Sequence, residues 1–191
     1  MDSGRWRGPG WRTFAADPAC GKAVRDWITR IIGAHPCPVD PQDAAVVVSE
    51  LFGNAVTHGP SGGTILVAYL LWPAGARIVI CDHGGPTLPR LRDPGNLTEG
   101  GRGLHVIDAL AARWGSFRAA PAQVVWADLG QPLPATGAEA WAWLTALLAA
   151  CPLDAQPAEP RTATPGPPRC PCLRPGDRVV AGDGQRGRRA R

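Results

Sequence analysis

Two apolar runs joined by a very short connection constrain the fold of this chain more than any other feature of its 191 residues. The first run extends from Thr64 to Trp72 and the second from Arg77 to Cys81, with Pro73-Ala74-Gly75 near the turn. Nearly continuous apolar runs of this length are typical of strands in a sheet that other elements cover. So short a connection returns the second strand beside the first, and we therefore predict an antiparallel hairpin.

Two amphipathic helices are predicted before the hairpin. Asp17 suits a helix N-cap, and apolar residues then recur at helical spacing over 18–33. Asp40 suits a second N-cap, before a helix over about 41–58. One arc of this second helix carries the polar residues Asp43, Glu50, Asn54 and Thr57, interrupted by Val46 and Val47. The two valines indicate that this arc faces a cleft rather than open water.

The remaining elements complete an α+β domain. We expect a short first strand over 11–15, a long Gly- and Pro-rich loop over 82–102, and two closing strands over 116–118 and 123–129. A third helix is expected after the loop, with apolar residues at helical spacing at Leu104, Ile107, Leu110, Ala111 and Trp114. The order predicts a two-layer α/β sandwich, with a mixed, mostly antiparallel sheet covered on one face by helices.

The charge of the chain is unevenly distributed. Residues 1–150 hold 12 Lys and Arg against 12 Asp and Glu, whereas residues 151–191 hold 8 Arg against 4 acids and also contain 8 prolines. We therefore expect the tail over 151–191 to be disordered. Before it we expect a flexible N-terminus over 1–10, a folded domain over 11–130 and a short helix over 136–150. The net charge of +4 belongs to the tail, so no direct nucleic-acid contact is expected of the domain.

The sequence also predicts a cytoplasmic protein. No apolar run reaches the roughly 20 residues that a membrane-spanning helix needs. Met1 to Arg7 has no apolar stretch behind its charges, unlike a secretory signal. The six cysteines are unevenly spaced, which does not suggest a set of disulfides.

Three segments carry residues suited to chemistry. Glu50 and Asn54 are four positions apart and project from the same side of a helix. A carboxylate and an amide placed in this way can orient a nucleophile and bind a hard cation such as Mg²⁺. Asp82 ends an apolar strand and is followed by Gly84, so a ligand amino group has an acceptor and space near the backbone. Each feature also suits an ordinary structural role, as a solvated helix face and a strand-ending turn.

The third segment, Gly100-Gly101-Arg102-Gly103-Leu104, leads directly into the third helix. Free N–H groups at a helix start favour an anion, and glycines admit a phosphate group. By itself the segment also suits a flexible loop. It matches neither the common phosphate-loop motif nor the dinucleotide-binding motif.

Taken together, the three segments resemble a known superfamily. The order of Ser49–Gly59, then Asp82-His83-Gly84, then Gly101-Arg102-Gly103-Leu104 is similar to the nucleotide-binding boxes of the GHKL ATPases, which share the Bergerat or histidine-kinase-like fold. Within that superfamily the chain resembles the bacterial anti-sigma-factor serine/threonine kinases and their actinobacterial single-domain relatives. The resemblance covers about residues 10–130.

The resemblance implies a role for each matching residue, with ATP and Mg²⁺ as cofactors. Glu50 matches the general base and Asn54 the Mg²⁺ ligand. Asp82 matches the acid that bonds the adenine amino group, and Gly84 the glycine that makes room for the base. Gly101, Arg102, Gly103 and Leu104 match the phosphate-binding segment at the start of the third helix, and residues 86–100 match the ATP lid.

The implied function is that of an ATP-binding regulator. It would bind a sigma factor and phosphorylate a Ser or Thr of an anti-sigma-factor antagonist protein; relatives often form homodimers. The second box departs from the family pattern at Gly85-Pro86-Thr87, where a further glycine is usual. An alternative is therefore a non-catalytic module in which nucleotide sets the shape of a protein-binding surface. A third hypothesis is nucleic-acid binding through the Arg-rich tail. It predicts an affinity for DNA that falls steeply as the salt concentration rises.

Overall fold

The predicted hairpin lies in the middle of a five-stranded sheet. The computed structural model describes residues 7–85, 88–90, 102–119 and 122–132. The strands are β1 (Arg7–Ala15), β2 (Thr64–Trp72), β3 (Gly75–Asp82), β4 (Arg113–Ala119) and β5 (Ala122–Gly130), in the order β1-β2-β3-β5-β4. Every pairing is antiparallel, and the hairpin register runs from Leu66 opposite Cys81 to Trp72 opposite Gly75.

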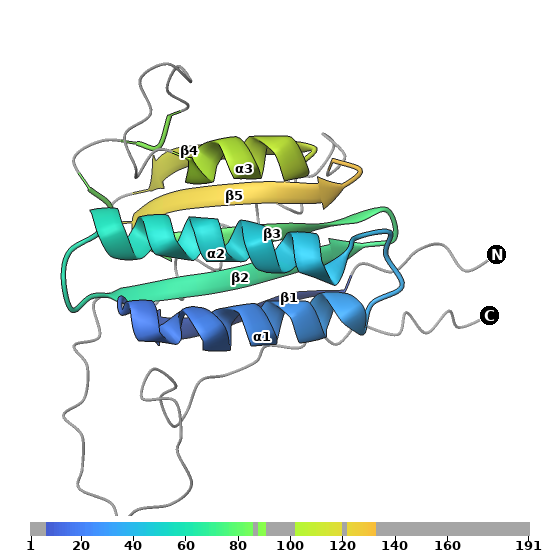
Figure 1. Ribbon diagram of the computed structural model, residues 1–191, viewed down its shortest axis with the longest axis horizontal. Helices are drawn as coiled ribbons and strands as arrows, with labels where there is room; N and C mark the ends of the chain where they lie inside the picture. The colour runs from blue at the N-terminus through green and yellow to red at the C-terminus, as the bar shows by residue number, and fades with distance from the viewer. Residues whose placement is uncertain (1–6, 86–87, 91–101, 120–121, 133–191) are drawn as a thin grey trace, which may run out of the picture.

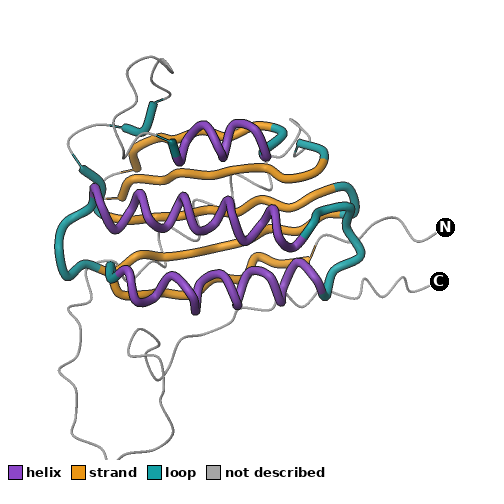
Figure 2. The backbone as a smooth tube through the Cα atoms, in the orientation of Figure 1, coloured by secondary structure: helices purple, strands orange, loops and turns teal. Residues whose placement is uncertain are grey.

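Three helices cover one face of this sheet. They are α1 (Gly21–Gly33), α2 (Pro41–His58) and α3 (Gly103–Leu110), and Figures 1 and 2 show all three on the same side of the strands. The central helix α2 packs against α1 and α3 and lies over β3 and β5. The predicted two-layer α+β fold is therefore confirmed, except that the described strands pair only antiparallel and the sheet is not mixed. None of the described helices is long and apolar enough to cross a membrane.

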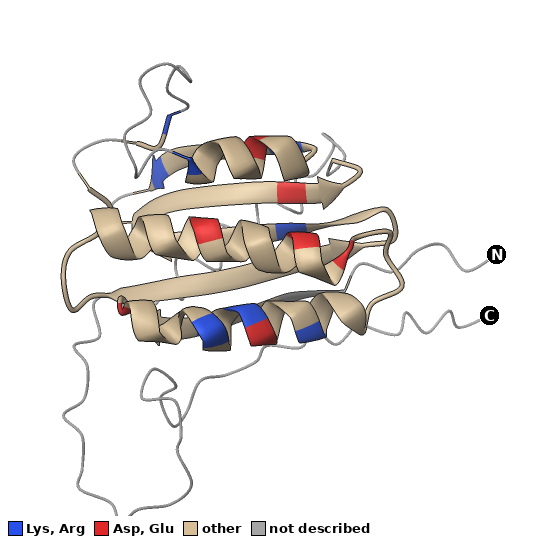
Figure 3. Cartoon of the chain, viewed as in Figure 1, with Lys and Arg blue, Asp and Glu red and all other residues tan. Residues whose placement is uncertain are grey.

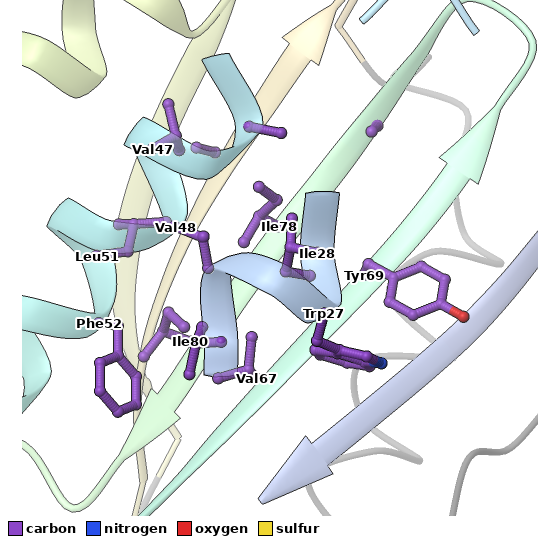
Figure 4. Packing of buried hydrophobic residues seen from close by; sticks show 14 of the residues in the cluster. Trp27, Ile28, Val47, Val48, Leu51, Phe52, Val67, Tyr69, Ile78 and Ile80 are labelled. Carbon is purple, nitrogen blue, oxygen red and sulfur yellow. The ribbon is translucent and has the colours of Figure 1, made fainter. Parts of the chain in front are cut away.

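The main core lies between the helices and the sheet. Alternate residues of β2 point into it, and α1 and α2 supply the opposing side chains, as Figure 4 shows for Ile28, Val48 and Leu51. Val47 is fully buried there, whereas Val46 is 41% exposed. The predicted polar arc of α2 is thus interrupted by a single exposed valine, because Val47 belongs to the core.

The opposite side of the sheet, which we call the second face, is also apolar. Its buried side chains are Leu66, Ala68, Leu70, Trp72, Val79, Cys81 and Val124. Because residues of both parities in β2 and β3 are buried, the strands read as continuous apolar runs rather than as alternating ones.

One buried charge cluster lies on the second face. Asp128 is fully buried and accepts hydrogen bonds from Arg77 at 2.6 and 2.9 Å and from Arg113 at 2.8 Å. The Arg77 guanidinium also lies 4.2 Å from the centre of the Trp126 ring. Such a cluster is tolerated inside a protein because each charge has an opposite partner and directed hydrogen bonds.

Element boundaries differ from the predictions at three places. β1 begins at Arg7, opposite Leu71, so residues 7–10 lie in a strand and not in a flexible terminus. Asp17 caps a short 3-10 helix, Pro18–Cys20, before α1 starts at Gly21. α3 ends at Leu110, and Trp114 lies in β4. In the first and third cases pairing with a neighbouring strand decided the backbone conformation, which local periodicity does not report.

Several predicted features lie outside the described residues: Gly101, most of the predicted lid, the helix over 136–150 and the tail over 151–191. Within the described part, charges of both signs are interspersed along α1, as Figure 3 shows. One pair there, Lys22 and Asp26, is exposed. A mixed distribution of this kind agrees with the neutral balance of residues 1–150.

Candidate functional site

Helix α2 presents Glu50 and Asn54 one turn apart on a half-buried side of the helix. The helix starts where the sequence predicts, because the Asp40 side chain accepts a hydrogen bond of 2.8 Å from the Gln42 N–H and Pro41 occupies the first turn. Its opposite side is anchored in the main core by Val48, Leu51 and other apolar residues. The two polar side chains are therefore held on a fixed helix, facing α3.

The start of α3 lies directly against these two side chains. A Cβ atom built on Gly103 would meet the Glu50 carboxylate and would lie 3.7 Å from Nδ2 of Asn54. Only glycine lets the first turn of α3 approach α2 so closely without displacing Glu50. The structure thus brings together two predicted site segments that are about 50 positions apart in the sequence.

Asp82 ends β3 and is only 4% exposed. Its Oδ1 atom accepts a hydrogen bond from the Gly84 N–H, which shapes the turn that follows the strand. Burial raises the pKa of the Asp82 carboxyl, and the Gly84 hydrogen bond and the nearby His83 act in the opposite direction. A buried carboxylate at this position would gain from a ligand amino group, since a donor hydrogen bond replaces the lost water.

Gln123 is a site residue that sequence reasoning missed. It pairs with Asp82 across β3 and β5, and its Oε1 atom is buried with no hydrogen-bond partner among the residues that the structure describes. A Cβ atom on Gly84 would lie 2.9 Å from that oxygen. The one available signal was a glutamine at the start of an apolar run, but only the strand register places it beside Asp82.

The two parts of the site meet near the end of α2. His58 is the last residue of α2, and a Cβ atom on Gly85 would lie 2.7 Å from the His58 carbonyl oxygen. Arg118 of β4 donates a 2.6 Å hydrogen bond to the Gly85 carbonyl oxygen. The turn after Asp82 is therefore fixed between the helix that carries Asn54 and the edge strand of the sheet.

Gly84 should tolerate substitution poorly. Its φ is +68°, and an added Cβ would lie 2.8 Å from the Gln123 side chain. We expect Gly84→Ala to lower the free energy of unfolding by about 1–3 kcal/mol, because alanine is strained at positive φ and Gln123 must move. Urea denaturation measures this change.

Gly53→Ala is the matched control for that variant. Gly53 is exposed inside α2, and apart from the adjacent backbone of α2 itself no atom of the described residues lies within 4 Å of a Cβ placed there. Alanine should therefore stabilise the protein by up to about 1 kcal/mol through its higher helix propensity. Equal effects of the same sign in the two variants would show that the turn at Gly84 is not restrained as described.

The other predicted site residues have different surroundings. Arg102 is exposed and immediately precedes α3, and its carbonyl oxygen accepts the Val106 N–H at 3.1 Å. Leu104 is half-buried and packs against the main core, so its side chain positions α3. Gly101 lies outside the described residues.

A magnesium ion fits this site only as a partner of a phosphate ligand. Among the described residues, no group of three His, Cys, Asp or Glu side chains could hold a metal ion. Glu50 and Asn54 do offer a carboxylate and an amide oxygen, the hard donors that Mg²⁺ prefers. Mg²⁺ commonly takes one or two protein ligands and completes its coordination with substrate phosphates and water.

Comparison with known proteins identifies the family of the domain. A family model described as the histidine kinase-like ATPase domain matches residues 14–127, more than half of the chain. Among solved structures, the chain is similar to the histidine kinase domain of the Erythrobacter litoralis EL346 blue-light activated histidine kinase, with 21% identity and a TM-score of 0.39. The match covers 59% of this chain and 60% of that chain. No curated protein matches the sequence.

The superfamily predicted from the three sequence segments is thereby confirmed. The matched range contains all the predicted site residues, from Glu50 to Leu104. An ATPase domain of this kind implies ATP binding. The chain belongs to the histidine kinase-like ATPase family.

Proposed function

We propose that this protein is a cytoplasmic regulator that uses Mg-ATP to phosphorylate a Ser or Thr of an anti-sigma-factor antagonist and that also binds the sigma factor. The observation that carries the proposal is the meeting of Glu50 and Asn54 with Gly103 at the start of α3. A base, an amide oxygen and a helix N-terminus then converge where a triphosphate would lie. The resemblance to the anti-sigma-factor kinases supports the choice of protein substrate.

In this proposal each residue has one task. The Glu50 carboxylate accepts the proton of the substrate hydroxyl while the hydroxyl oxygen bonds to the γ-phosphorus. The bond between the γ-phosphorus and the β–γ bridging oxygen breaks, and ADP leaves. Asn54 would hold Mg²⁺, whose chemistry when bound is to neutralise charge on the triphosphate. Arg102 and the first N–H groups of α3 would bind phosphate oxygens.

The adenine would lie at the ends of β3 and β5. Asp82 would accept a hydrogen bond from the adenine amino group. The Gln123 oxygen beside it, which has no partner among the described residues, would be an additional acceptor. Gly84 matches the glycine that makes room for the base in the resembling kinases, and without a side chain its turn packs directly against Gln123. Base and triphosphate would thus bind along the C-terminal half of α2.

A second candidate function is a nucleotide-dependent binding module without phosphoryl transfer. The turn after Asp82 is tied to β4 by the Arg118 hydrogen bond to Gly85. Nucleotide bound at Asp82 would therefore also fix the edge strand, which is a surface that a partner protein could read. ATP binding with no transfer of the labelled γ-phosphate to antagonist proteins encoded near this chain would select this alternative.

Replacing Asn54 with alanine should weaken magnesium-dependent ATP binding. We expect the wild type to bind ATP with micromolar affinity in the presence of Mg²⁺, and Asn54→Ala to weaken this by roughly tenfold or more, because the amide ligand is lost. Isothermal titration calorimetry with and without Mg²⁺ measures both affinities.

Gln42→Ala is the control, since it removes an exposed amide from the other end of the same helix. Its ATP affinity should equal that of the wild type. An Asn54→Ala protein that binds Mg-ATP as tightly as the wild type would overturn the assignment of the site.

A further inference from the structure

The second face of the sheet raises the question of what covers it. Its side chains are buried; Leu70 is 5% exposed, Trp72 3% and Cys81 0%. All three described helices, however, pack on the other face, and the described residues of the second-face clusters come from the strands and the β2–β3 turn. An apolar surface of this extent requires a partner, because leaving it in water is unfavourable.

The chain leaves the sheet at the edge of this face. After β5 ends at Gly130, the Gln131 N–H donates a 2.8 Å hydrogen bond to the Ala74 carbonyl oxygen, in the β2–β3 turn. A Cβ atom on Gly75 would lie 2.7 Å from both the Gln131 carbonyl oxygen and the Trp72 ring. Gln131 is thus held beside Trp72, one of the residues to be covered.

Residues 136–150, which follow in the sequence, are also mostly apolar. Residues 136–150 contain one charged side chain, Glu139, and place Trp141, Leu144 and Leu148 on one arc of a helix. A helix that is apolar over most of its surface is stable in water only when it is buried against another surface. We propose that residues 136–150 fold as a helix across the second face of the sheet and shield it from water.

The dimensions suit this occupant. A helix of 15 residues is about 22 Å long, and five strands about 4.8 Å apart make a sheet of similar width. The five steps from Gln131 to Thr136 reach at most about 17 Å, enough to turn from the β2–β3 turn onto the adjoining face. The short connection also favours this segment over a second copy of the chain, because its effective concentration is in the millimolar range.

Cysteine labelling of the full-length chain tests the proposal. Cys81 is buried on the second face, whereas Cys20 is 1% exposed in the main core, where burial raises the pKa of its thiol to about 11. The rate of alkylation at each cysteine, followed by peptide mass spectrometry, reports the opening of each face separately. Cys20 therefore serves as an internal control for global unfolding.

The informative variant is Leu144→Asp combined with Leu148→Asp. It should speed alkylation of Cys81 roughly tenfold or more and leave Cys20 unchanged, because two carboxylates oppose docking on an apolar face. Ala146→Asp, on the arc that carries Glu139, should change neither rate by more than about twofold. If the double variant also exposes Cys20, the milder Leu144→Ala variant gives the decisive comparison.

Three results would overturn the proposal. One is an equal Cys81 rate in the wild type and in the Leu144 variants that keep Cys20 protected. Another is equal exposure of Cys81 by Ala146→Asp, which would remove the link to one helix arc. The third is a wild-type Cys81 rate that rises on dilution while the mass in sedimentation falls from dimer to monomer, since a second copy would then be the occupant.

Discussion

Asp128→Ala is expected to lower the free energy of unfolding by about 3–5 kcal/mol. The wild-type carboxylate is fully buried and bonds both Arg77 and Arg113. Arg77 is itself 9% exposed, so the variant leaves a guanidinium charge out of water without its partner. Contact with the Trp126 ring remains, but a cation–π contact is worth less than the lost ion pair. Urea denaturation followed by circular dichroism measures the loss.

Two further variants make this test specific. Asp26→Ala removes an acid whose partner, Lys22, is largely exposed, and should leave stability nearly unchanged. Replacing both members of the buried pair, as Arg77→Met with Asp128→Leu, should recover most of the loss, because no buried charge of that pair is left without its partner. Arg113 also loses its acceptor, but its side chain is 40% exposed and water can solvate it. A loss below about 1 kcal/mol in Asp128→Ala would mean that water reaches Arg77 on the second face.

Glu50→Gln is expected to lower the rate of phosphoryl transfer roughly 10²- to 10⁴-fold while ATP affinity stays within about threefold of the wild type. Glutamine keeps the size of the side chain and its place against Gly103, but it cannot accept the proton of the substrate hydroxyl. Transfer of labelled γ-phosphate to the antagonist protein under single-turnover conditions measures the rate, and calorimetry measures the affinity.

Asp43→Asn is the matched control for Glu50→Gln. It makes the same change of charge two turns, about 10 Å, earlier along the axis of α2, and should transfer phosphate at the wild-type rate. Equal rates in wild type and Glu50→Gln would remove Glu50 as the base. Bound ATP with no transfer by the wild type itself would favour the non-catalytic module instead.

The parts of the fold that were predictable have local causes. Asp40 and Pro41 mark the start of α2 because a capping side chain and a proline act within one turn. The hairpin of β2 and β3 followed from two apolar runs and a short connection, which allow only an antiparallel return. The start of β1 at Arg7 and the strand conformation of Trp114 depend on pairing with β2 and β5, and local periodicity does not contain that information.

For the site, the sequence by itself determined the residue types and their order: Glu50 with Asn54, then Asp82 with Gly84, then Gly103. Only the tertiary structure decided which of them meet. It placed Gly103 against Glu50 and Asn54, and it set Gln123 beside Asp82 through the register of β3 and β5. The physical reason is that helix caps and hairpins arise from neighbours in the chain, whereas close approaches between elements depend on how side chains pack in three dimensions.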